Sequence, residues 1–485
     1  MQLSLNDPTA FSVQAVMQAG NGSIVFPLVQ GMGFVTGIYS NLTPMLQTGI
    51  FFRAVEKAGT VNGMTKYRIT LEDSKIWLLY ATGDVTFNLI GNGKIEGPAN
   101  FSGIVQLAKT PKDSRTAESL YDSAAGTFAL GRTLSGSIDG STGNYNLSHQ
   151  KQGNGPLLMF ALPHHVQSIT GAQVTDIQLQ TTTKGIATAV IGDIWNLREN
   201  DLPVSMGFEP WSVSGGTHVT TDTNTFSIMA ASAASETGQD INGQTNLDSM
   251  YFSGKGLSKF AALAWTIHDV LKDGNLASVA LQKLKDAFAV FAENRQKYPL
   301  VYETAWKSLV STAAYVTGDA GADFGNTWEN DHHFHYAYFV HAAAIIGYLD
   351  SGWLAANREY VNSLVRDVSN PSTADPFFPV FRSFDWYSGH SWAKGLFESG
   401  DGKDEESTSE DALFSYALKM WGRVSGDANM EARGNLMLAV QRRSFNNYFL
   451  MSANNNVQPR QFIGNKAAGI TFDNKIGTSQ LTVRR

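Results

Sequence analysis

The stretch Asn330-Asp331-His332-His333-Phe334-His335-Tyr336-Ala337-Tyr338 opens a predicted helix, His332 to Leu349, and sets one carboxylate among imidazoles and aromatic rings. Further along the chain, Glu405-Glu406-Ser407-Thr408-Ser409-Glu410 brings three glutamates into six residues. Burial against rings raises the pKa of a carboxyl group and a nearby cation lowers it. Two acids in different surroundings can therefore act as proton donor and proton acceptor at one pH, as cleavage of a glycosidic bond requires.

The composition bounds the class of protein around these two stretches. A length of 485 residues suggests two to three domains, and 43% hydrophobic with 16% charged residues indicates a globular chain. The formal net charge of -7 argues against nucleic acid as a partner, because phosphate binding needs a basic surface. A neutral polymer fits better. The chain has no cysteine, so disulfides and thiolate metal sites are excluded.

Neither a leader nor a membrane span is expected from the sequence. The first eight residues, Met1 to Pro8, lack a basic segment followed by an apolar one, so they do not resemble a signal peptide. No run of about twenty apolar residues occurs, which is the length that a membrane-spanning helix needs.

The first half of the chain is typical of short β-strands. Four apolar runs, separated by clusters of Gly, Asn, Asp and Ser, are Gly33 to Tyr39, Lys75 to Tyr80, Asp84 to Ile90 and Leu157 to Leu162. Many short strands with turn signals predict a β-sandwich or layered antiparallel sheets. The polar stretch Ser212 to Asn246 marks the expected boundary.

Beyond this boundary the apolar period changes from two towards 3.6. We expect a multidomain β + α protein with a β-sandwich domain at 1–235, a linker at 236–255 and a helical domain at 256–485. Paired helices of this length can stack in a ring. The helices expected are Gly256 to Lys272, Leu276 to Lys297, Trp306 to Val316, His332 to Leu349, Ala355 to Val368, Ser407 to Val424 and Met430 to Met451.

Aromatic residues in polar loops are a second functional signal. Tryptophan ordinarily fills protein cores, but Trp328, Trp386 and Trp392 each lie in a polar loop close to Asp or His. The run from Phe384 to Trp392 mixes rings with Asp, Ser and His, which are costly to bury without partners. These features favour an open groove in which flat rings stack on sugar units.

The two glutamates Glu406 and Glu410 have both a structural and a catalytic interpretation. A spacing of four places them on one face of a helix. Ser407 and Glu410 also form a good capping box, with Ser407 as the N-cap. The interpretations are compatible, because a helix N-terminus keeps a carboxylate ionised, as a catalytic base requires.

Asp331 precedes an apolar helix, so N-capping is its plain structural interpretation. The imidazoles of His332, His333 and His335 could bind zinc, but neither a His-Glu-x-x-His spacing nor a cysteine supports a metal site. Hydrogen bonding to a hydroxyl-rich ligand, or orientation of Asp331, is favoured. The residues themselves therefore give a metal site little support.

Several motifs of unusual composition follow one another along the chain. They are Pro27 to Thr36, Tyr251 to Gly256, Tyr302 to Trp306, Asp323 to Asn326, Asn330 to Tyr336, Phe384 to Tyr387, Gly389 to Trp392, Asp401 to Lys403 and Glu406 to Glu410. Together they resemble glycoside hydrolase family 81, the endo-β-1,3-glucanases. The resemblance spans most of the chain.

The resemblance implies an N-terminal β-sandwich, a C-terminal (α/α)6 barrel and hydrolysis of internal β-1,3-glucosidic bonds by inversion. Carried over by motif, Asp331 is the expected general acid and Glu410 the favoured general base, with Glu406 positioning or polarising the water. The partner implied is a β-1,3-glucan of the laminarin type, bound by a monomer, with no nucleic acid and no membrane. Residues expected to bind the glucan are Trp328, His332, His335, Tyr336, Asp385, Trp386, Tyr387, His390 and Trp392.

The chain departs from the family pattern in three ways. Glu405 stands where the family usually has an amide, so an extra negative charge is expected to raise neighbouring pKa values. Ala337 replaces a glycine. Both ends also look shorter than the family's, because about seven helices are expected where the barrel needs twelve and Thr478 to Arg485 does not match its continuation. We therefore expect an incomplete barrel with exposed apolar faces.

Two other functions remain open at this point. A shortened relative could bind β-1,3-glucan without hydrolysing it, and a metal-dependent helical protein could be built on the three histidines. The compartment is unknown from the sequence; by resemblance, an extracellular or cell-wall location is expected.

Overall fold

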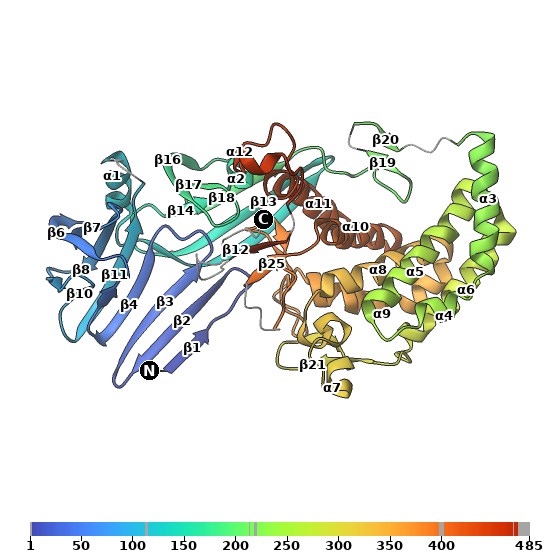
Figure 1. The fold of residues 1–485 in the computed structure, drawn as a ribbon, viewed down its shortest axis with the longest axis horizontal. Coiled ribbons are helices and arrows are strands. Elements are labelled where there is room, and N and C mark those ends of the chain that lie inside the picture. Colours follow the sequence, from blue (N-terminus) through green and yellow to red (C-terminus); the bar gives the residue numbers. More distant parts are fainter. Residues whose placement is uncertain are drawn as a thin grey trace. The chain divides into compact units, whose positions relative to one another are not determined.

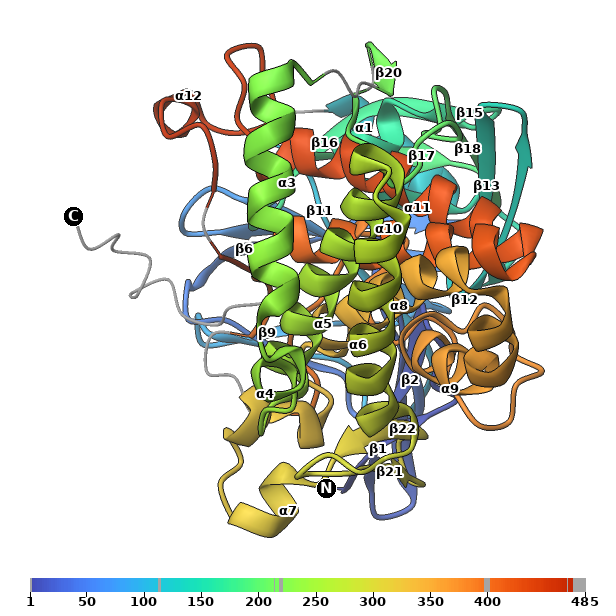
Figure 2. The same ribbon diagram turned by 90° about the vertical axis from the view of Figure 1, so that its right-hand side faces the viewer.

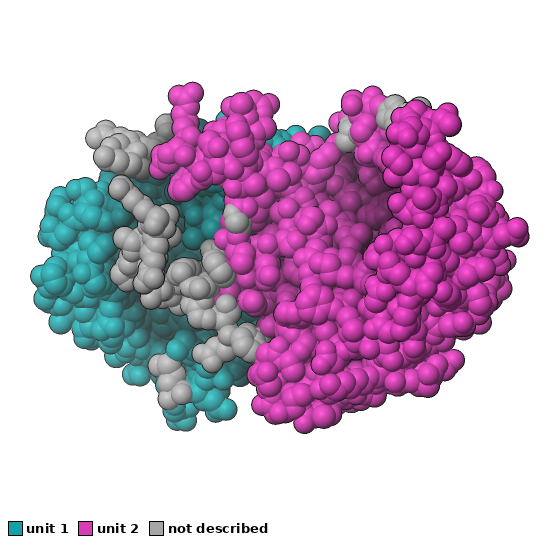
Figure 3. Space-filling model, turned by 45° about the vertical axis from the view of Figure 1, so that its right-hand side comes forward, with its two compact units in different colours: residues 1–137, 144–198, 456–459 teal, residues 138–143, 199–455, 460–485 magenta. Residues whose placement is uncertain are grey.

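The computed structural model describes residues 2–111, 115–212, 214–217, 221–396, 402–468 and 470–473. Asp401 and the stretch Thr478 to Arg485, both singled out above, lie outside these residues. The chain forms two compact units (Figure 3). Unit 1 comprises Met1–Ser137, Asn144–Arg198 and Asn456–Pro459, and unit 2 comprises Ile138–Gly143, Glu199–Asn455 and Arg460–Arg485. None of the helices in the described ranges has the length and apolar character to cross a membrane.

Unit 1 is rich in antiparallel β-structure (Figure 1). Its largest sheet has eight strands in the order β1 (Gln2–Asn6), β2 (Ser12–Ala19), β3 (Gly22–Val29), β4 (Val35–Leu42), β11 (Phe101–Lys109), β8 (Ile76–Thr82), β7 (Met64–Leu71) and β6 (Phe52–Val61). Smaller sheets are formed by β5 (Met45–Gln47), β10 (Lys94–Glu96) and β9 (Asn88–Ile90), and by β14 (Leu158–Ala161), β17 (Ile186–Ile191) and β16 (Gln173–Gln180). The helices of this half are α1 (Arg115–Ala124) and α2 (Pro163–Val166).

A four-stranded sheet is formed by β12 (Phe128–Asp139), β13 (Thr142–Gln152), β18 (Ile194–Glu199) and β15 (Ile169–Thr170). Side chains of β18 alternate strictly between exposed and buried positions, the period of two that a half-buried strand shows. The apolar core of the large sheet includes Tyr67, Leu79 and Phe101, against which Phe87 and Ile95 pack. The prediction of a β-rich first half is confirmed.

Unit 2 is mainly helical (Figure 2). Its helices are α3 (Thr223–Gly238), α4 (Ile241–Thr245), α5 (Met250–Trp265), the π-helix η1 (Thr266–Leu271), α6 (Gly274–Ala292), α7 (Ala313–Thr317), the 3-10 helix η2 (Ala322–Trp328), α8 (His332–Leu349), α9 (Ser351–Ser369), α10 (Thr408–Ser425), α11 (Ala428–Tyr448) and α12 (Arg460–Ile463). Helix α8 packs against α5, α9 and α10. Most of its residues are buried, as expected for a helix that is apolar on all sides.

Short two-stranded sheets complete unit 2. They pair β19 (Trp211–Ser212) with β20 (Gly216–Thr217), β21 (Leu300–Glu303) with β22 (Ser308–Ser311), β23 (Phe384–Asp385) with β24 (His390–Ser391), and β25 (Lys403–Glu405) with β26 (Thr471–Asp473). Several helices begin at a side chain that accepts a hydrogen bond from a backbone amide of the first turn, the usual N-cap. Those caps are Asp222, Asp240, Ser249, Asp273, Asp350, Ser407 and Asp427.

Two sequence predictions differ from the structure. The helix expected from Trp306 to Val316 is wrong, because this segment contains β22 and then the short α7. Short apolar runs do not separate strand from helix by periodicity, and here Lys307 turns the chain with φ of 56°. The expected linker at 236–255 contains α4 and the start of α5, and the compact units divide at Arg198 rather than near residue 235. Asp caps start helices inside a polar stretch that resembled a linker.

Candidate active site

Asp331 occupies the N-cap position of α8 but does not cap the helix with its side chain. Its backbone is left-handed, with φ of 58° and ψ of 20°. The carboxyl oxygen Oδ1 is buried and has no hydrogen-bond partner among the described residues. The plain N-cap interpretation of Asp331 is therefore wrong, because a capping carboxylate accepts from the first-turn amides.

The segment before α8 is strained. Asp323, Phe324, Glu329 and Asp331 all have positive φ, between 49° and 66°. Such conformations are unfavourable for residues with a Cβ and concentrate where function requires an unusual backbone. Backbone hydrogen bonds hold the end of the segment, since the amide of Asp331 donates to the carbonyl of Ala393 at 2.9 Å.

The surroundings of Asp331 favour the protonated form of its carboxyl group. Burial raises the pKa of Asp331 to about 7, and the negative charges of Glu406 and Asp404 act in the same direction. Lys394 opposes them. Asp404 lies on β25 and is 1% exposed, with its carbonyl accepting from the amide of Ala393 at 2.9 Å. An acid with this pKa can donate a proton to a leaving group at neutral pH.

This environment predicts a pH dependence. If protonated Asp331 is the active form, kcat/KM should fall as the pH rises through about 7, the pKa of Asp331. Lys394→Met should move this basic limb to higher pH, because Lys394 lowers the pKa of Asp331, and Glu406→Gln should move it to lower pH. Initial rates on laminarin across pH 4 to 10 measure both shifts. Two variants that move the limb in the same direction would contradict this electrostatic origin.

Glu410, on the first turn of α10, lies in the opposite kind of surroundings. Its Oε1 accepts hydrogen bonds from the hydroxyls of Tyr251 at 2.8 Å and Tyr338 at 2.5 Å. Lys255 Nζ lies 3.9 Å from the same oxygen. Ser407 caps α10 as predicted, accepting from the amide of Glu410 at 3.4 Å. One oxygen of Glu410 thus has two hydroxyl donors and a cation close to it.

Glu406 and Glu405 differ sharply in exposure. Glu406 is exposed, whereas Glu405 is 1% exposed and its Oε2 lies 3.8 Å from His390 Nδ1. The charges that raise the pKa of Asp331 come from Glu406 and Asp404. Whether Glu405 shifts neighbouring groups stays a prediction.

A buried polar network supports the N-terminus of α8. His332 Nδ1 lies 2.6 Å from Asp367 Oδ2, and its Nε2 lies 2.9 Å from the carbonyl oxygen of Asn326. Both members of the His332–Asp367 pair are fully buried. Arg382 extends the network, with NH1 3.1 Å from Glu329 Oε2 and NH2 3.5 Å from Asp367 Oδ1. These contacts fix the segment that carries Asp331.

Breaking this network should destabilise the fold. Asp367→Ala leaves the fully buried His332 without its acidic partner, while Arg382 keeps its ion pair with Glu329, and the expected loss of free energy of unfolding is about 3–5 kcal/mol. Glu293→Ala removes the exposed pair with Arg295, and should cost about 0–1 kcal/mol. Urea denaturation followed by circular dichroism compares the two. Equal losses in the two variants would show that the buried His332–Asp367 pair stabilises the fold no more than an exposed ion pair does.

His335 and Tyr336 contact residues that precede α8 in the chain. Asn326 Nδ2 donates to His335 Nδ1 at 3.1 Å, and the Tyr336 hydroxyl donates to the carbonyl of Leu309 at 2.6 Å. Both side chains are almost completely buried, as is His332. Direct glucan binding by these three residues stays a prediction. Their contacts fit a role in positioning Asp331 and its neighbours.

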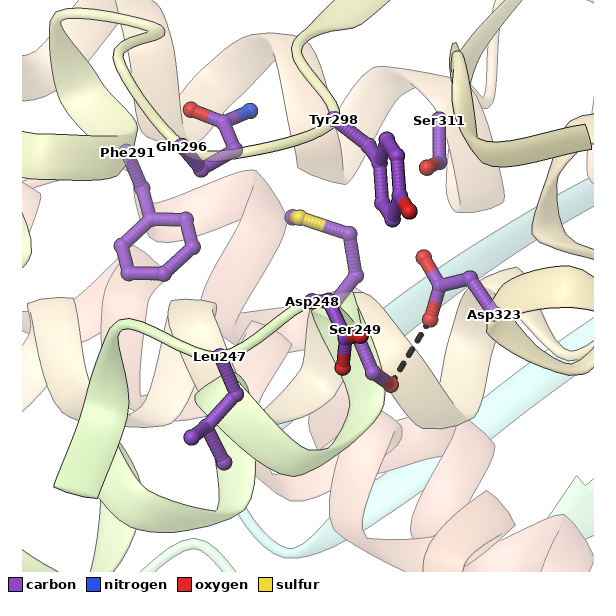
Figure 4. A pocket seen from close by; sticks show the side chains of 9 residues that line it. Leu247, Asp248, Ser249, Phe291, Gln296, Tyr298, Ser311 and Asp323 are labelled. Atoms are coloured by element: carbon purple, nitrogen blue, oxygen red, sulfur yellow. Dashed lines mark hydrogen bonds between the residues drawn. The ribbon is translucent and has the colours of Figure 1, made fainter. Parts of the chain in front are cut away.

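Asp323 joins this segment to the N-terminus of α5. Its Oδ1 accepts from the hydroxyl of Ser249 at 2.8 Å, and Ser249 itself caps α5 (Figure 4). Burial raises the pKa of Asp323 to about 6. Asp323 and Ser311 lie on one side of a small pocket whose apolar side includes Leu247 and Phe291 (Figure 4). Helix α5, which carries Tyr251 and Lys255, is thereby anchored to the segment before α8.

The loop between β23 and β24 is organised by Asp385. Its Oδ1 accepts from the amides of Tyr387 and Ser388, and its Oδ2 accepts from the indole N–H of Trp392 at 2.9 Å. Trp392 and Trp328 are half-buried. Trp386 is only 2% exposed and packs on Phe381 and Phe384, as a core tryptophan does. His390 is fully buried. Glucan binding by these loop residues stays a prediction.

The three histidines of the Asp331 stretch do not form a metal centre. His332 and His335 have the separate partners described above, and burial lowers the pKa of His333 to about 3. Among the residues that the structure places, no group of three His, Asp or Glu side chains could hold a metal ion. The alternative of a metal-dependent protein built on these histidines has no support in this geometry.

Sequence reasoning missed several groups around the two carboxylates. They are Tyr251, Lys255, Tyr338, Asp367, Lys394 and Asp404. Tyr338 follows Asp331 by seven residues, which is two helical turns and therefore the same face of α8. That spacing could have identified it.

Comparisons with known protein families match nearly the whole chain. Residues 1–213 match the family model for the Glycosyl hydrolase family 81 N-terminal domain, and residues 220–481 match the Glycosyl hydrolase family 81 C-terminal domain. A solved structure of glycoside hydrolase family 81 from Clostridium thermocellum has the same fold, with a TM-score of 0.79 at 21% sequence identity. The match covers 97% of this chain and 64% of that chain.

Three curated fungal relatives are similar over almost all of the chain. The chain is 52% identical, over 98% of its length and 54% of the relative's, to the Glucan endo-1,3-beta-D-glucosidase of Arthroderma benhamiae. It is 43% identical to the Primary septum glucan endo-1,3-beta-D-glucosidase of Schizosaccharomyces pombe, over 94% of this chain and 45% of the relative. It is 39% identical to the Glucan endo-1,3-beta-D-glucosidase 2 of Saccharomyces cerevisiae, over 98% and 63%. The chain thus spans between about half and two thirds of these relatives' length.

Proposed function

Because the chain belongs to glycosyl hydrolase family 81, we propose that it hydrolyses internal β-1,3-glucosidic bonds of a β-1,3-glucan with inversion of configuration. One observation carries this proposal. Asp331 is partly buried close to negative charges, and Glu410 is held by two hydroxyls beside a cation. Two carboxyl groups in opposite environments provide one proton donor and one proton acceptor at the same pH. The three relatives compared above carry the name of this activity.

Each carboxyl group has one role in the proposed reaction. Asp331 donates its proton to the glycosidic oxygen as the bond from C1 to that oxygen breaks. Glu410 accepts a proton from the water that attacks C1 on the opposite face, and Glu406 polarises this water. An inverting site needs about 6.5–9.5 Å between acid and base, so that the water fits between base and sugar. The reaction requires no cofactor.

The remaining assignments of the proposal concern binding and fold. The half-buried Trp328 and Trp392 are assigned to stacking on sugar units, with Tyr387 and Asp385 shaping the loop that carries Trp392. Five buried residues position the catalytic and sugar-stacking side chains without lying at the surface themselves. They are His332, His335, Tyr336, Trp386 and His390. We further propose that unit 2 is an (α/α)6-type catalytic domain, that unit 1 is a β-sandwich, and that the chain acts as a monomer.

Hydrolysis of a soluble β-1,3-glucan tests the proposal. An endo-acting enzyme should lower the viscosity of carboxymethyl curdlan early, while few reducing ends have appeared, and should leave a β-1,4-glucan intact. A slow viscosity loss with many reducing ends would indicate cleavage from chain ends. Retention on immobilised laminarin without any reducing ends would favour the alternative of a non-hydrolytic glucan-binding relative.

A further inference from the structure

Three side chains from two helices converge on one oxygen of Glu410. Tyr251 and Lys255 lie on α5, four residues apart, and Tyr338 lies on α8. The hydroxyls of both tyrosines donate to Glu410 Oε1, at 2.8 Å and 2.5 Å. Lys255 Nζ donates to the Tyr251 hydroxyl at 2.9 Å and lies 4.6 Å from the centre of its ring. We call Tyr251, Tyr338 and Lys255 the Oε1 clamp.

The clamp treats the two oxygens of the carboxylate differently. A carboxylate oxygen accepts about two hydrogen bonds, and Oε1 has two donors from the clamp. None of the hydrogen bonds among the described residues reaches Oε2. The Glu410 side chain is 19% exposed, so solvent can reach it. Oε1 of Glu410 therefore has its full number of hydrogen bonds, whereas Oε2 can still accept one.

The hydroxyl protons of the clamp cannot be transferred easily to Glu410. Burial and the neighbouring carboxylate raise the pKa of Tyr338, and burial also raises the pKa of Tyr251. Both hydroxyls therefore remain neutral donors at working pH. Lys255 fixes the direction of the Tyr251 hydrogen bond, because an ammonium can only donate, so the Tyr251 hydroxyl hydrogen must point to Glu410.

We propose that the Oε1 clamp positions Glu410 so that Oε2 is the oxygen that removes the proton from the attacking water. This inference rests on the proposed function and names the base within it. In the step, the water oxygen bonds to C1, its proton moves to Glu410 Oε2, and the glycosidic bond breaks as Asp331 gives its proton to the leaving oxygen. Both carboxyl groups then exchange protons with solvent and return to their starting states.

Glu406 has a different setting. It is exposed, and its charge acts on Asp331. The titratable side chains that contact Glu410 among the described residues are Tyr251 and Lys255 of α5 and Tyr338 of α8. Glu410 is favoured over Glu406 as the base because the clamp holds one oxygen of the Glu410 carboxylate in place. A catalytic group held by its neighbours loses less freedom in the transition state.

Phenylalanine substitutions test the clamp with little change of volume. Tyr338→Phe and Tyr251→Phe should each lower kcat on laminarin by about 10- to 100-fold, the range for loss of one positioned hydrogen bond to a reacting group, with KM changed by less than about threefold. The acidic limb of kcat/KM should move to higher pH, because one hydrogen-bond donor to the carboxylate is lost. Lys255→Met should also lower kcat and move the acidic limb to higher pH, but by less than the two phenylalanine variants. Tyr348→Phe, also on α8 but half exposed, is the matched control and should leave all three quantities unchanged.

A second measurement does not depend on activity. In protein labelled with ¹³C at glutamate side-chain carboxyls, the Glu410 resonance is assigned by its absence in Glu410→Gln. Its titration midpoint should lie at higher pH in Tyr338→Phe than in the unsubstituted protein. The same midpoint in both proteins would overturn the clamp, whatever the substrate.

The two measurements separate the clamp from the proposed function. If the unsubstituted chain releases no reducing ends from laminarin while the midpoint still moves, the clamp stands and the proposed reaction fails. If the chain is active but both phenylalanine variants keep its kcat and pH profile, the reaction stands and the clamp fails. A lower melting temperature with unchanged kinetics would show that the tyrosines only pack α5 and α8 against α10.

Discussion

Asp331→Asn is expected to lower the rate of laminarin hydrolysis by about 10²- to 10⁴-fold, the contribution of a well-placed general acid. Asparagine has nearly the same shape but carries no transferable proton. The fold should survive, because the buried Oδ1 of Asp331 has no partner to lose among the described residues. Reducing-end release measures the loss, and Asp319→Asn, in an exposed turn ahead of η2, is the matched control with expected full activity.

The choice of leaving group shows whether Asp331 acts as the acid. A dinitrophenyl β-laminaribioside has a leaving group that needs no proton, so Asp331→Asn should cleave it almost as fast as the unsubstituted chain. A loss as large as on laminarin would instead mean that Asp331 binds substrate or holds the fold.

The pH dependence of the stability of Asp331→Asn tests whether the pKa of Asp331 is raised in the folded chain. A pKa of about 7 for Asp331 in the fold, against an ordinary value of 3.8, means that the folded chain binds the proton more tightly than the unfolded chain. Stability should therefore fall as the pH rises from about 4 to 7, and the asparagine variant should lack this part of the fall. Melting temperatures across that range compare the two proteins.

Glu410→Ala is expected to be the second strongly inactivating change, with a loss of about 10²- to 10⁴-fold. The substitution removes the proton acceptor and opens space for a small anion. Because azide needs no base to become a nucleophile, added azide should restore turnover and yield an α-glycosyl azide, the product of attack opposite to the β-linked leaving group.

Glu406→Ala is the internal comparison for this experiment. In Glu406→Ala the attacking water still has Glu410 as its proton acceptor. Added azide should therefore not restore the rate of this variant. Azide rescue of Glu406→Ala but not of Glu410→Ala would exchange the roles of the two glutamates and remove the basis for the Oε1 clamp.

Much of the fold could be predicted from local sequence pattern. Helix α8 begins and ends where the apolar run from His332 to Leu349 predicts, because an all-apolar helix has few alternatives to burial. Ser407 caps α10 as expected from its position before a helical period. The hairpin of β21 and β22 could not be foreseen, since its short apolar run fits either strand or helix and tertiary pairing decides.

For the candidate site, the sequence motifs predict two carboxylates but not the side chains around them. The catalytic roles of Asp331 and Glu410 stay predictions. The left-handed backbone that directs Asp331 away from capping has no signal in residue type, because aspartate at an N-cap is ordinary. Tyr251, Tyr338 and Asp367 come from α5, α8 and α9, and only the packing of these helices brings them to their partners.

The configuration of the first product tests the central claim most directly. Proton NMR recorded within the first minutes of laminarin hydrolysis separates newly formed α- and β-reducing ends before they equilibrate. The proposed single displacement, with Asp331 as acid and Glu410 as base, predicts that the α-anomer appears first. Early accumulation of the β-anomer would mean a double displacement through a covalent intermediate, which contradicts the proposed mechanism.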